Sequence, residues 1–157
     1  MNEADVLEKA VAAGLRFLSY RPRSEAEMRD RLRRRYSDEV VQAAIQRLKE
    51  DGLVDDRAFA LAWSESRASH RPRSAALVRR ELLEKGVPRD IAQEAAVTVD
   101  DEVSAYSAGQ RAAASLTEAD YQTFRRRLWG YLHRRGFSQS IIRRTTRRLW
   151  EEGGGGQ

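Results

Sequence analysis

Arg21-Pro22-Arg23-Ser24 recurs as Arg71-Pro72-Arg73-Ser74, 50 residues further along the chain. A fixed period of this length is typical of a protein built from copies of one supersecondary unit, stacked on one another. We therefore read the chain as three modules, and expect its function on a modular surface rather than in one pocket. Other positions follow the same offset: Leu32 with Leu82 and Leu132, Val41 with Ile91 and Ile141, and Gly86 with Gly136.

The hydrophobic pattern is helical in nearly every segment, and no segment alternates as a β-strand does. We predict an all-α fold of three tandem three-helix repeats, about nine helices, in an elongated, curved arrangement. The modules are expected over residues 1–54, 55–100 and 101–152, followed by a disordered glycine-rich tail over residues 153–157.

Residues that typically begin and end helices mark the helix boundaries within each module. Ser24 with Glu27 three residues later is a capping box, in which each side chain accepts a hydrogen bond from a backbone amide. Asp55 and Asp56 suit helix capping better than a cation site, because a carboxylate at a helix start meets free amides. Further predicted starts and stops are Ser37, Thr117 and Ser138, and Gly52, Gly86 and Gly136.

Apolar residues at helical spacing give the expected buried stripes. The first helix of module 1, over about residues 3–20, is expected to bury Val11, Leu15 and Leu18. Its counterpart in module 2 is expected to bury Phe59, Ala62, Trp63 and Ser66. The stripes of the second and third helices are Met28, Leu32 and Tyr36; Val41, Ala44, Ile45 and Leu48; Val78 and Leu82; Ala92, Ala95, Ala96 and Val99; Tyr121, Phe124, Leu128 and Leu132; and Ile142, Thr145 and Leu149.

The composition argues against several function classes. The chain has no cysteine, and its two histidines, His70 and His133, have no neighbouring cluster of metal ligands, so we expect no metal, no cofactor and no catalysis. No apolar run approaches the roughly 20 residues of a membrane span, and the acidic start of the chain is unlike a signal peptide. The expectation is a monomeric cytoplasmic protein with no membrane association.

Positive charge is concentrated in the last third of the chain. Residues 101–157 hold 10 basic and 6 acidic residues, against 11 and 10 in residues 1–54 and 8 and 8 in residues 55–100. Nine arginines follow one another without an acidic residue between them, and those of the last helix lie opposite its apolar stripe. Such a density of like charge favours an anionic partner. The candidate binding residues are Arg125, Arg126, Arg127, Arg134, Arg135, Arg143, Arg144, Arg147 and Arg148.

The arginines of the second helix of module 1 are interpreted differently. Glu25, Glu27 and Asp30 each precede an arginine by four residues, a spacing that favours ion pairs along a helix. We therefore expect a largely self-neutralised, solvated face, with the pairs Glu25–Arg29, Glu27–Arg31 and Asp30–Arg34.

Several stretches, in this order and spacing, resemble the RecX family, whose members regulate the RecA recombinase. The first is Leu18 to Ser24 with Glu27 and Leu32, and the second is Gly52 to Asp56 followed by Phe59 and Ala60. Glu81-Leu82 with Lys85-Gly86-Val87 is similar to a third family motif, and Arg134 to Phe137 to a fourth. The third module fits the family pattern least well.

The resemblance implies tandem three-helix repeats that lodge in the groove of the RecA–DNA filament. It implies inhibition of filament growth and of the ATPase and co-protease activities of RecA, and hence a role in DNA repair, recombination and the SOS response. RecA in its filament form is the expected partner, with single- or double-stranded DNA as a further expected contact. Ser24, Leu32, Phe59, Leu82 and Phe137 are expected to build the fold rather than to touch the partner.

Two other functions fit the residues. A basic last helix in a three-helix unit is also found in helix-turn-helix transcriptional regulators, although no Asn or Gln stands among the arginines to read bases. A helical scaffold that binds only protein is the other alternative. The salt dependence of binding separates it from a phosphate-binding protein.

Overall fold

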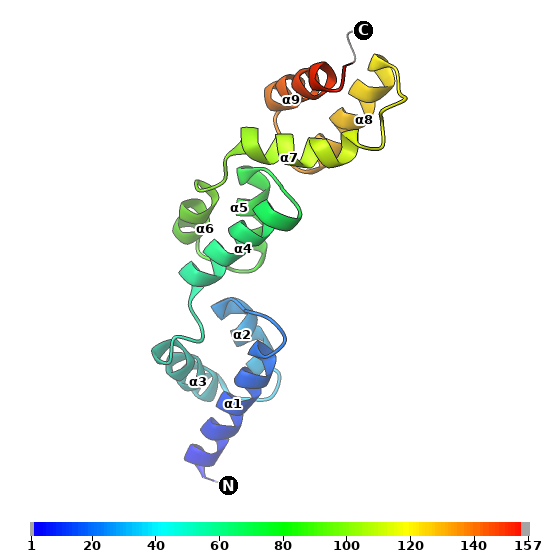
Figure 1. Cartoon of the computed structure of the whole chain (residues 1–157). Helices are drawn as coiled ribbons and strands as arrows, with labels where there is room; N and C mark the ends of the chain where they lie inside the picture. The colour runs from blue at the N-terminus through cyan, green and yellow to red at the C-terminus, as the bar shows by residue number, and fades with distance from the viewer. Residues whose placement is uncertain (1, 155–157) are drawn as a thin grey trace. The chain divides into compact units, whose positions relative to one another are not determined.

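The structure is a computed structural model that describes residues 2–154, and within them it contains helices and no β-strand (Figure 1). Three helices make up each of three modules, which confirms the predicted all-α fold of tandem three-helix repeats. The predicted tail lies partly outside the described residues, at 155–157, and the curved arrangement stays a prediction. The helices are α1 (Glu3–Leu18), α2 (Glu25–Leu32) and α3 (Asp38–Glu50) in module 1, α4 (Asp56–His70), α5 (Ala75–Glu84) and α6 (Arg89–Ala96) in module 2, and α7 (Asp101–Ala113), α8 (Tyr121–Arg134) and α9 (Gln139–Glu152) in module 3.

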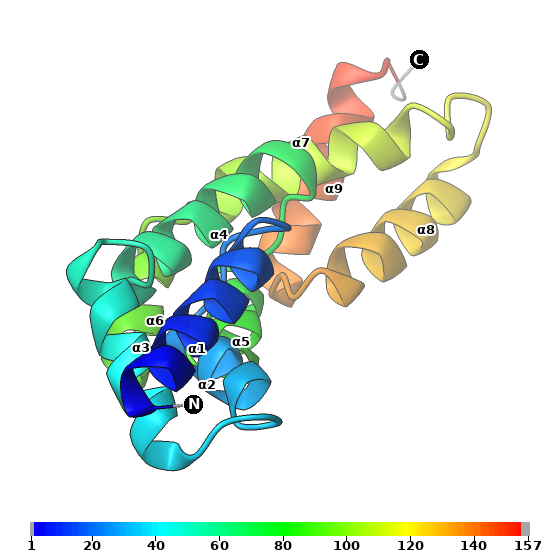
Figure 2. The ribbon, with the colours of Figure 1, turned by 90° about the horizontal axis from the view of Figure 1, so that it is seen from below.

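The chain divides into two compact units, and the middle module contributes to both. Unit 1 consists of the chain up to Ala62 together with Glu81–Ala92, and unit 2 consists of Trp63–Arg80 together with the chain from Gln93 onward. Figure 2 shows the helices of unit 2 from another side, including the connection over residues 114–120 that leads from α7 to α8.

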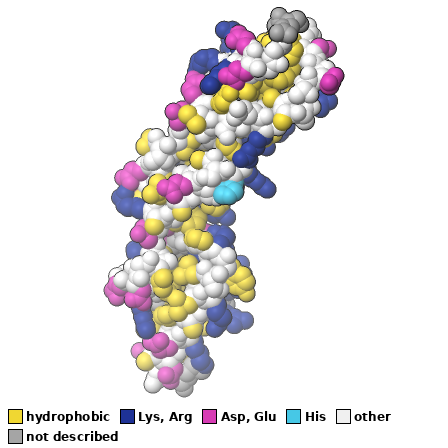
Figure 3. Space-filling view, viewed as in Figure 1, with side chains coloured by type: hydrophobic (Ala, Val, Ile, Leu, Met, Phe, Trp, Pro, Cys, Tyr) yellow, Lys and Arg dark blue, Asp and Glu magenta, His cyan; other side chains and the backbone are white. Residues whose placement is uncertain are grey.

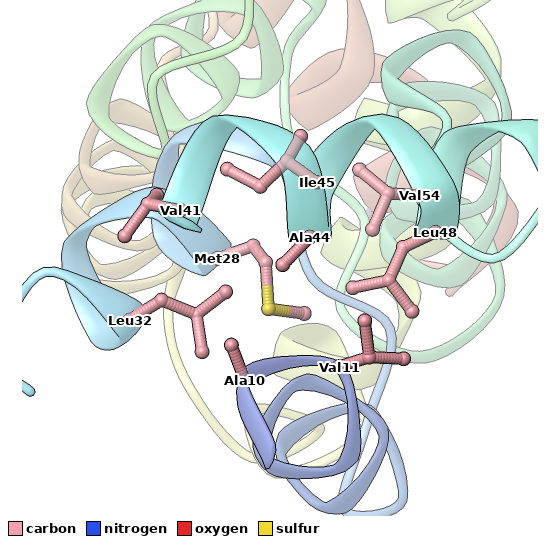
Figure 4. Packing of buried hydrophobic residues seen from close by; sticks show 9 residues of the cluster. All are labelled: Ala10, Val11, Met28, Leu32, Val41, Ala44, Ile45, Leu48 and Val54. Carbon is pink, nitrogen blue, oxygen red and sulfur yellow. The ribbon is translucent and has the colours of Figure 1, made fainter. Parts of the chain in front are cut away.

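The core of module 1 forms around a methionine of α2. Met28 is fully buried between α1 and α3, with Ala10 and Val11 on one side and the stripe of α3 on the other (Figure 4). The predicted α3 stripe is confirmed, because Val41, Ala44, Ile45 and Leu48 are all at most 2% exposed. The second helices are largely as predicted, since Leu32, Val78, Leu82, Leu128 and Leu132 are buried. Tyr121, at the first position of α8, is 42% exposed, so its predicted burial was wrong.

The first helix of a module packs through small residues rather than large ones. Ala10 and Gly14 are buried in α1, and Ala105 and Gly109 are buried in α7. A Cβ atom on Gly14 would lie 2.9 Å from the Cδ1 atom of Leu48, and one on Gly109 would lie 2.7 Å from Cδ1 of Leu149. The third helix therefore approaches the backbone of the first.

This close packing overturns part of the predicted stripes. Leu15 is 44% exposed, because the α1 face that meets α3 is the one that holds Ala10 and Gly14. In α4 the same pattern appears as Ala60 and Ser64, which are buried, whereas Ala62 and Ser66 are exposed. The predictions for Leu15, Ala62 and Ser66 were wrong.

The repeat has a slightly different register in the third helices. The buried equivalents are Val41, Ala92 and Ile142, whereas Ile91 and Ile141 are only half-buried. The 50-residue offset that holds for the second helices is thus interrupted by one extra residue before α6. Aligning Val41 with Ile91 and Ile141 was wrong by one position.

Most predicted helix ends are confirmed. Ser24 and Glu27 form the capping box, and Ser37 and Ser138 cap α3 and α9. Gly52, Gly86 and Gly136 have positive φ angles of 72°, 80° and 88°, as glycines that end helices often do. One start was wrong: Asp120 rather than Thr117 caps α8, by accepting a hydrogen bond from the Thr123 amide.

In unit 1, the start of α2 contacts the turn that follows α5. The Ser24 side chain donates a hydrogen bond to the Lys85 carbonyl oxygen at 2.6 Å. The Ser24 amide is already bonded to the Glu27 carboxylate, so the hydroxyl group is the donor left for this contact. Gly86 approaches Ala26 so closely that a Cβ atom on Gly86 would lie 2.3 Å from the Ala26 Cβ. We call this the α2–Gly86 contact.

In unit 2, the start of α5 makes an equivalent contact with the turn that follows α8. Ser74 caps α5 by accepting from the Leu77 amide, and its own amide donates to the Arg135 carbonyl oxygen at 3.0 Å. The amide is available because the residue three positions on is leucine and not glutamate. A Cβ atom on Gly136 would lie 2.4 Å from the Ser74 Oγ atom. The repeated tetrapeptide thus supplies the same kind of contact twice, here as the α5–Gly136 contact.

A pair of aspartates completes each contact. Asp55 and Asp100 cap α4 and α7, which confirms capping for the first of the two predicted aspartates. Asp56 instead accepts a hydrogen bond from the Glu25 amide at 2.9 Å, at the start of α2. Asp101 does the same for the Ala75 amide at 2.8 Å, at the start of α5. The second aspartate therefore caps a helix of the preceding module.

Two alanine substitutions separate the effect of the positive φ angle at Gly86 from the effect of its close approach to Ala26. Gly52→Ala places a side chain at positive φ in open space, and we expect it to lower the free energy of unfolding by about 1–2 kcal/mol. Gly86→Ala adds the clash with Ala26, so its loss is expected to be at least about twice as large. Urea denaturation followed by circular dichroism measures both, and equal losses would show that the close approach is unimportant.

Asp56 should respond differently to removal of its charge and removal of its oxygen. Burial raises the pKa of the Asp56 carboxyl group, against the hydrogen bond from Glu25, which lowers it. Asp56→Asn keeps an acceptor and should change stability little, whereas Asp56→Ala leaves the Glu25 amide unpaired and should cost about 1 kcal/mol.

The pH dependence provides the control for this prediction. Because the folded state holds the Asp56 proton up to a higher pH than the unfolded state, the contribution of Asp56 to stability falls as the pH rises from its ordinary pKa through the raised one. Relative to the wild-type chain, the Asp56→Asn variant should therefore gain stability across that window. Parallel stability curves of the two proteins would contradict a raised pKa.

Candidate anion-binding grooves

The nine candidate arginines lie on α8, on the turn after it and on α9, and all but the half-buried Arg135 are exposed. They do not form one face. Arg126, Arg127 and Arg134 line a groove between α7 and α8, whereas Arg125 and Arg143 line another between α8 and α9. Their proximity in sequence thus overstated their proximity in space.

Two arginines of the α9 face are already paired with acidic residues. Arg144 Nε donates to the Glu102 carboxylate of α7 at 3.0 Å. Arg148 Nε donates to Glu152 at 2.9 Å, and its guanidinium group lies 3.8 Å from the centre of the Tyr106 ring. The helical pattern of α9 alone did not reveal Glu102. Of the four arginines on this face, Arg143 and Arg147 have no ion pair among the described residues.

A more concentrated positive site lies between α7 and α8. This groove of about 590 Å³ is lined by Arg111 of α7 and by Arg126, Arg127 and Arg134 of α8. The α8 arginines stand on the face that also presents Tyr131, because positions three, four and seven residues apart share one side of a helix.

A second cavity, of about 380 Å³, continues this groove, since Arg111 and Tyr131 line both. It adds Arg71 and Arg73, which belong to the repeated tetrapeptide, and Arg135. In Figure 3, basic side chains gather beside a histidine where the α4–α5 turn meets α7. Across the part of unit 2 that the structure describes, no acidic side chain lines either cavity. We call the combined site the C-terminal arginine groove, and its arginines are Arg71, Arg73, Arg111, Arg126, Arg127, Arg134 and Arg135.

Contacts within the groove hold Arg135 in place. Its guanidinium group lies 3.5 Å from the centre of the Tyr131 ring, and its Nη1 atom donates to the Tyr131 carbonyl oxygen at 3.0 Å. Burial lowers the pKa of Arg135, and the positive charges of Arg134, Arg73 and Arg71 lower it further. These like charges are close enough to repel one another, so an anion in the groove would relieve the repulsion.

Sequence reasoning missed three arginines of this groove. Arg71 and Arg73 were treated as part of a structural motif, and Arg111 stood alone in its helix. Arg111 is fixed by hydrogen bonds to the His70 and Ser69 carbonyl oxygens, the latter 3.3 Å long. A sequence signal did exist, because the tetrapeptide and the glycine turn both recur after 50 residues, as Arg71 to Ser74 and as Gly136.

Module 1 has a related site, the N-terminal arginine groove, between α1 and α2. Arg16, Arg34 and Arg35 line it, at positions equivalent to Arg111, Arg134 and Arg135 of module 3. Of the predicted pairs on α2, only Glu25–Arg29 forms, at 3.5 Å. Glu27 pairs with Arg21 instead, and no ion pair joins Asp30 to Arg34 within the described residues. The prediction of a self-neutralised face was wrong at these two pairs.

The remaining candidates for chemistry give little. Among residues 2–154, no group of three or more metal-binding side chains comes together. His133 stacks on Trp129 with ring centres 4.4 Å apart, and His70 contacts the Ser66 carbonyl oxygen at 3.3 Å. Within residues 2–154, no helix combines the length and the hydrophobicity needed to span a bilayer.

Comparison with known proteins gives the same family at every module. Residues 10–48 match the first three-helix domain of RecX, residues 55–95 the second and residues 100–145 the third. The crystal structure of RecX from Lactobacillus salivarius has the same fold, with a TM-score of 0.78, 23% sequence identity and coverage of 93% of this chain and 97% of that one.

Two relatives support the assignment over the whole chain. The regulatory protein RecX of Thermobifida fusca is 35% identical over 154 residues, which is 96% of this chain and 83% of the relative. The regulatory protein RecX of Chlorobium limicola is 34% identical over 146 residues, which is 92% of each chain. Because each of its three modules matches a RecX domain and these relatives align with it over most of their length, the chain belongs to the RecX family of regulatory proteins.

Proposed function

We propose that the chain regulates the RecA recombinase by binding in the groove of the RecA–DNA filament. The bound chain impedes filament growth and lowers the ATPase and co-protease activities of RecA. Membership of the RecX family supports this proposal, because the relatives are named as regulatory proteins. The observation that carries it in this chain is the C-terminal arginine groove, where seven arginines, and no acidic residue of the described part of the chain, line two adjoining cavities.

The groove is suited to an extended anionic surface. Arg127 and Arg134 are exposed, without an ion pair among the described residues, and point from one face of α8. Arginine holds carboxylate and phosphate groups with two hydrogen bonds at once, so the groove can grip acidic side chains of RecA or phosphates of its DNA. A chain attached in this way along the filament occupies surface that incoming subunits need, which explains the inhibition.

The direct test adds the purified chain to RecA filaments assembled on single-stranded DNA and follows ATP hydrolysis and strand exchange. Both rates are expected to fall as the chain is added. Unchanged rates at a saturating concentration of the chain would overturn the proposal.

Paired charge reversals locate the attachment surface. Arg127→Glu with Arg134→Glu should weaken filament binding at least tenfold, because each removes a charge-assisted contact worth about 1.5–3 kcal/mol. Arg143→Glu with Arg147→Glu makes the same change in net charge on α9, outside the groove. Binding is measured by co-sedimentation with the filament, and helix content by circular dichroism. If the α9 pair alone lowers binding, the predicted α9 face is the attachment surface and the groove is not.

The transcriptional-regulator alternative is tested by footprinting on bare duplex DNA at moderate salt. We expect no discrete protected site. One would favour sequence-specific DNA recognition over filament regulation.

A further inference from the structure

The N-terminal arginine groove differs in its chemistry from the groove in unit 2. It has a volume of about 610 Å³ and lies where α1 and α2 both end, so that arginines from the two helix ends face a common space. Helix C-termini favour positive side chains, which offsets part of the repulsion among them. Within the described residues, no acidic side chain lines this groove.

Three of its arginines have no partner in the part of the chain that the structure describes. The side chains of Arg16, Arg34 and Arg35 are exposed and make no hydrogen bond or ion pair there. Two acidic residues of α2 are engaged elsewhere: Glu25 with Lys49 at 2.9 Å, and Glu27 with Arg21. The third, Asp30, does not line the groove and makes no ion pair with Arg34 within the described residues. The positive charge of the groove is therefore left for an external anion.

An exposed aromatic ring lies beside these charges. Tyr20 is 83% exposed, the most exposed of the large hydrophobic side chains described, and no ring contact among the described residues involves it. Two other rings line the groove. Arg23 lies 3.8 Å from the centre of the Phe17 ring and Arg31 lies 5.2 Å from it, and the Tyr36 ring is half-buried against the core of module 1. Arg23 is also fixed by a hydrogen bond to the Phe17 carbonyl oxygen at 3.2 Å. Tyr20 is thus the ring that a ligand can stack on.

Unpaired arginines next to a free aromatic ring are typical of sites for single-stranded nucleic acid, in which phosphates meet the charges and an unpaired base meets the ring. An acidic peptide would satisfy the arginines and leave Tyr20 unused, and a duplex keeps its bases stacked inside. We propose that the N-terminal arginine groove binds single-stranded DNA, with Tyr20 stacked on a base and Arg16, Arg34 and Arg35 on phosphates. The choice of DNA over RNA rests on the proposed function.

The test measures binding of a fluorescein-labelled 15-nucleotide oligothymidylate to the full chain by fluorescence anisotropy, without RecA. Tyr20→Ala should weaken binding about 5- to 150-fold, since a stacked base contributes that range. Tyr20→Phe should bind like the wild type, because it keeps the ring. The dependence of affinity on salt should be unchanged in both variants, since neither removes a charge.

Removal of a charge, unlike removal of the ring, should change how strongly the affinity depends on salt. Arg34→Ala should make the slope of log affinity against log salt shallower by about 0.7, the value for one phosphate contact on a single strand. Lys9→Ala is the matched control, because Lys9 is an exposed basic residue of α1 outside the groove, and its slope should equal that of the wild type.

Three results would overturn the inference: equal binding of the Tyr20→Ala variant, equal affinity for a duplex of the same length, or tighter binding of a poly-glutamate peptide. A uridine 15-mer that binds more tightly than the thymidine one would overturn the choice of DNA. Because RecA is absent, failure here leaves the RecA assay standing, and failure of the RecA assay leaves Tyr20-dependent DNA binding standing.

Discussion

A buried serine at the start of a second helix is the constraint on which the fold depends. Ser24 and Ser74 are fully buried, so every polar group they carry must find a partner. The hydroxyl oxygen of each accepts a hydrogen bond from an amide in the first turn of its own helix. Each serine also donates to a backbone carbonyl oxygen in a glycine turn: Ser24 to Lys85 through its hydroxyl group, and Ser74 to Arg135 through its amide. The turn can come this close only because its glycine lacks a Cβ atom. Where module 3 has Phe124 in place of the serine, the side chain packs against Trp150 at 5.1 Å between ring centres instead, and α8 begins four residues earlier.

The contact made by Ser74 also brings arginine side chains together. The α5–Gly136 contact bonds the Arg135 carbonyl oxygen to Ser74, and the guanidinium group of Arg135 then lines the cavity that holds Arg71 and Arg73. The residues that begin α5 and the residues that end α8 therefore meet because of a backbone hydrogen bond, and their side chains have to share the space around it. One tetrapeptide therefore has both roles: its serine makes the α5–Gly136 contact, and its two arginines line the cavity beside that contact.

The sequence predicted what is local and missed what depends on neighbouring helices. Capping by Ser24, Ser37 and Ser138 and the positive φ angles of the turn glycines follow from a few adjacent residues, so these predictions held. The stripe of α1 failed at Leu15 because hydrophobicity favours the large residue, whereas the close approach of α3 selects the face with Ala10 and Gly14. Asp120 was missed because Thr117, three residues before it, is also of a type that caps helices. The charge of α9 was overestimated because Glu102, far away in the sequence, is its partner. None of these failures could be corrected from one helix at a time.

The two arginine grooves show how copies of one unit can differ in the side chains that they offer to a ligand. Arg34 and Arg35 in module 1 occupy the positions of Arg134 and Arg135 in module 3, so the charge is shared. The grooves differ in their aromatic rings: the guanidinium group of Arg135 covers the Tyr131 ring at 3.5 Å, whereas the Tyr20 ring is exposed. A covered ring strengthens the hold on a guanidinium group and leaves a surface that detects negative charge alone. A free ring adds a preference for a planar ligand. Module 2 has Glu84 and Lys85 at the equivalent positions, and the backbone of Lys85 is used in the α2–Gly86 contact. Its turn is thus committed to holding α2, and the two end modules carry the positions in which binding chemistry can diverge.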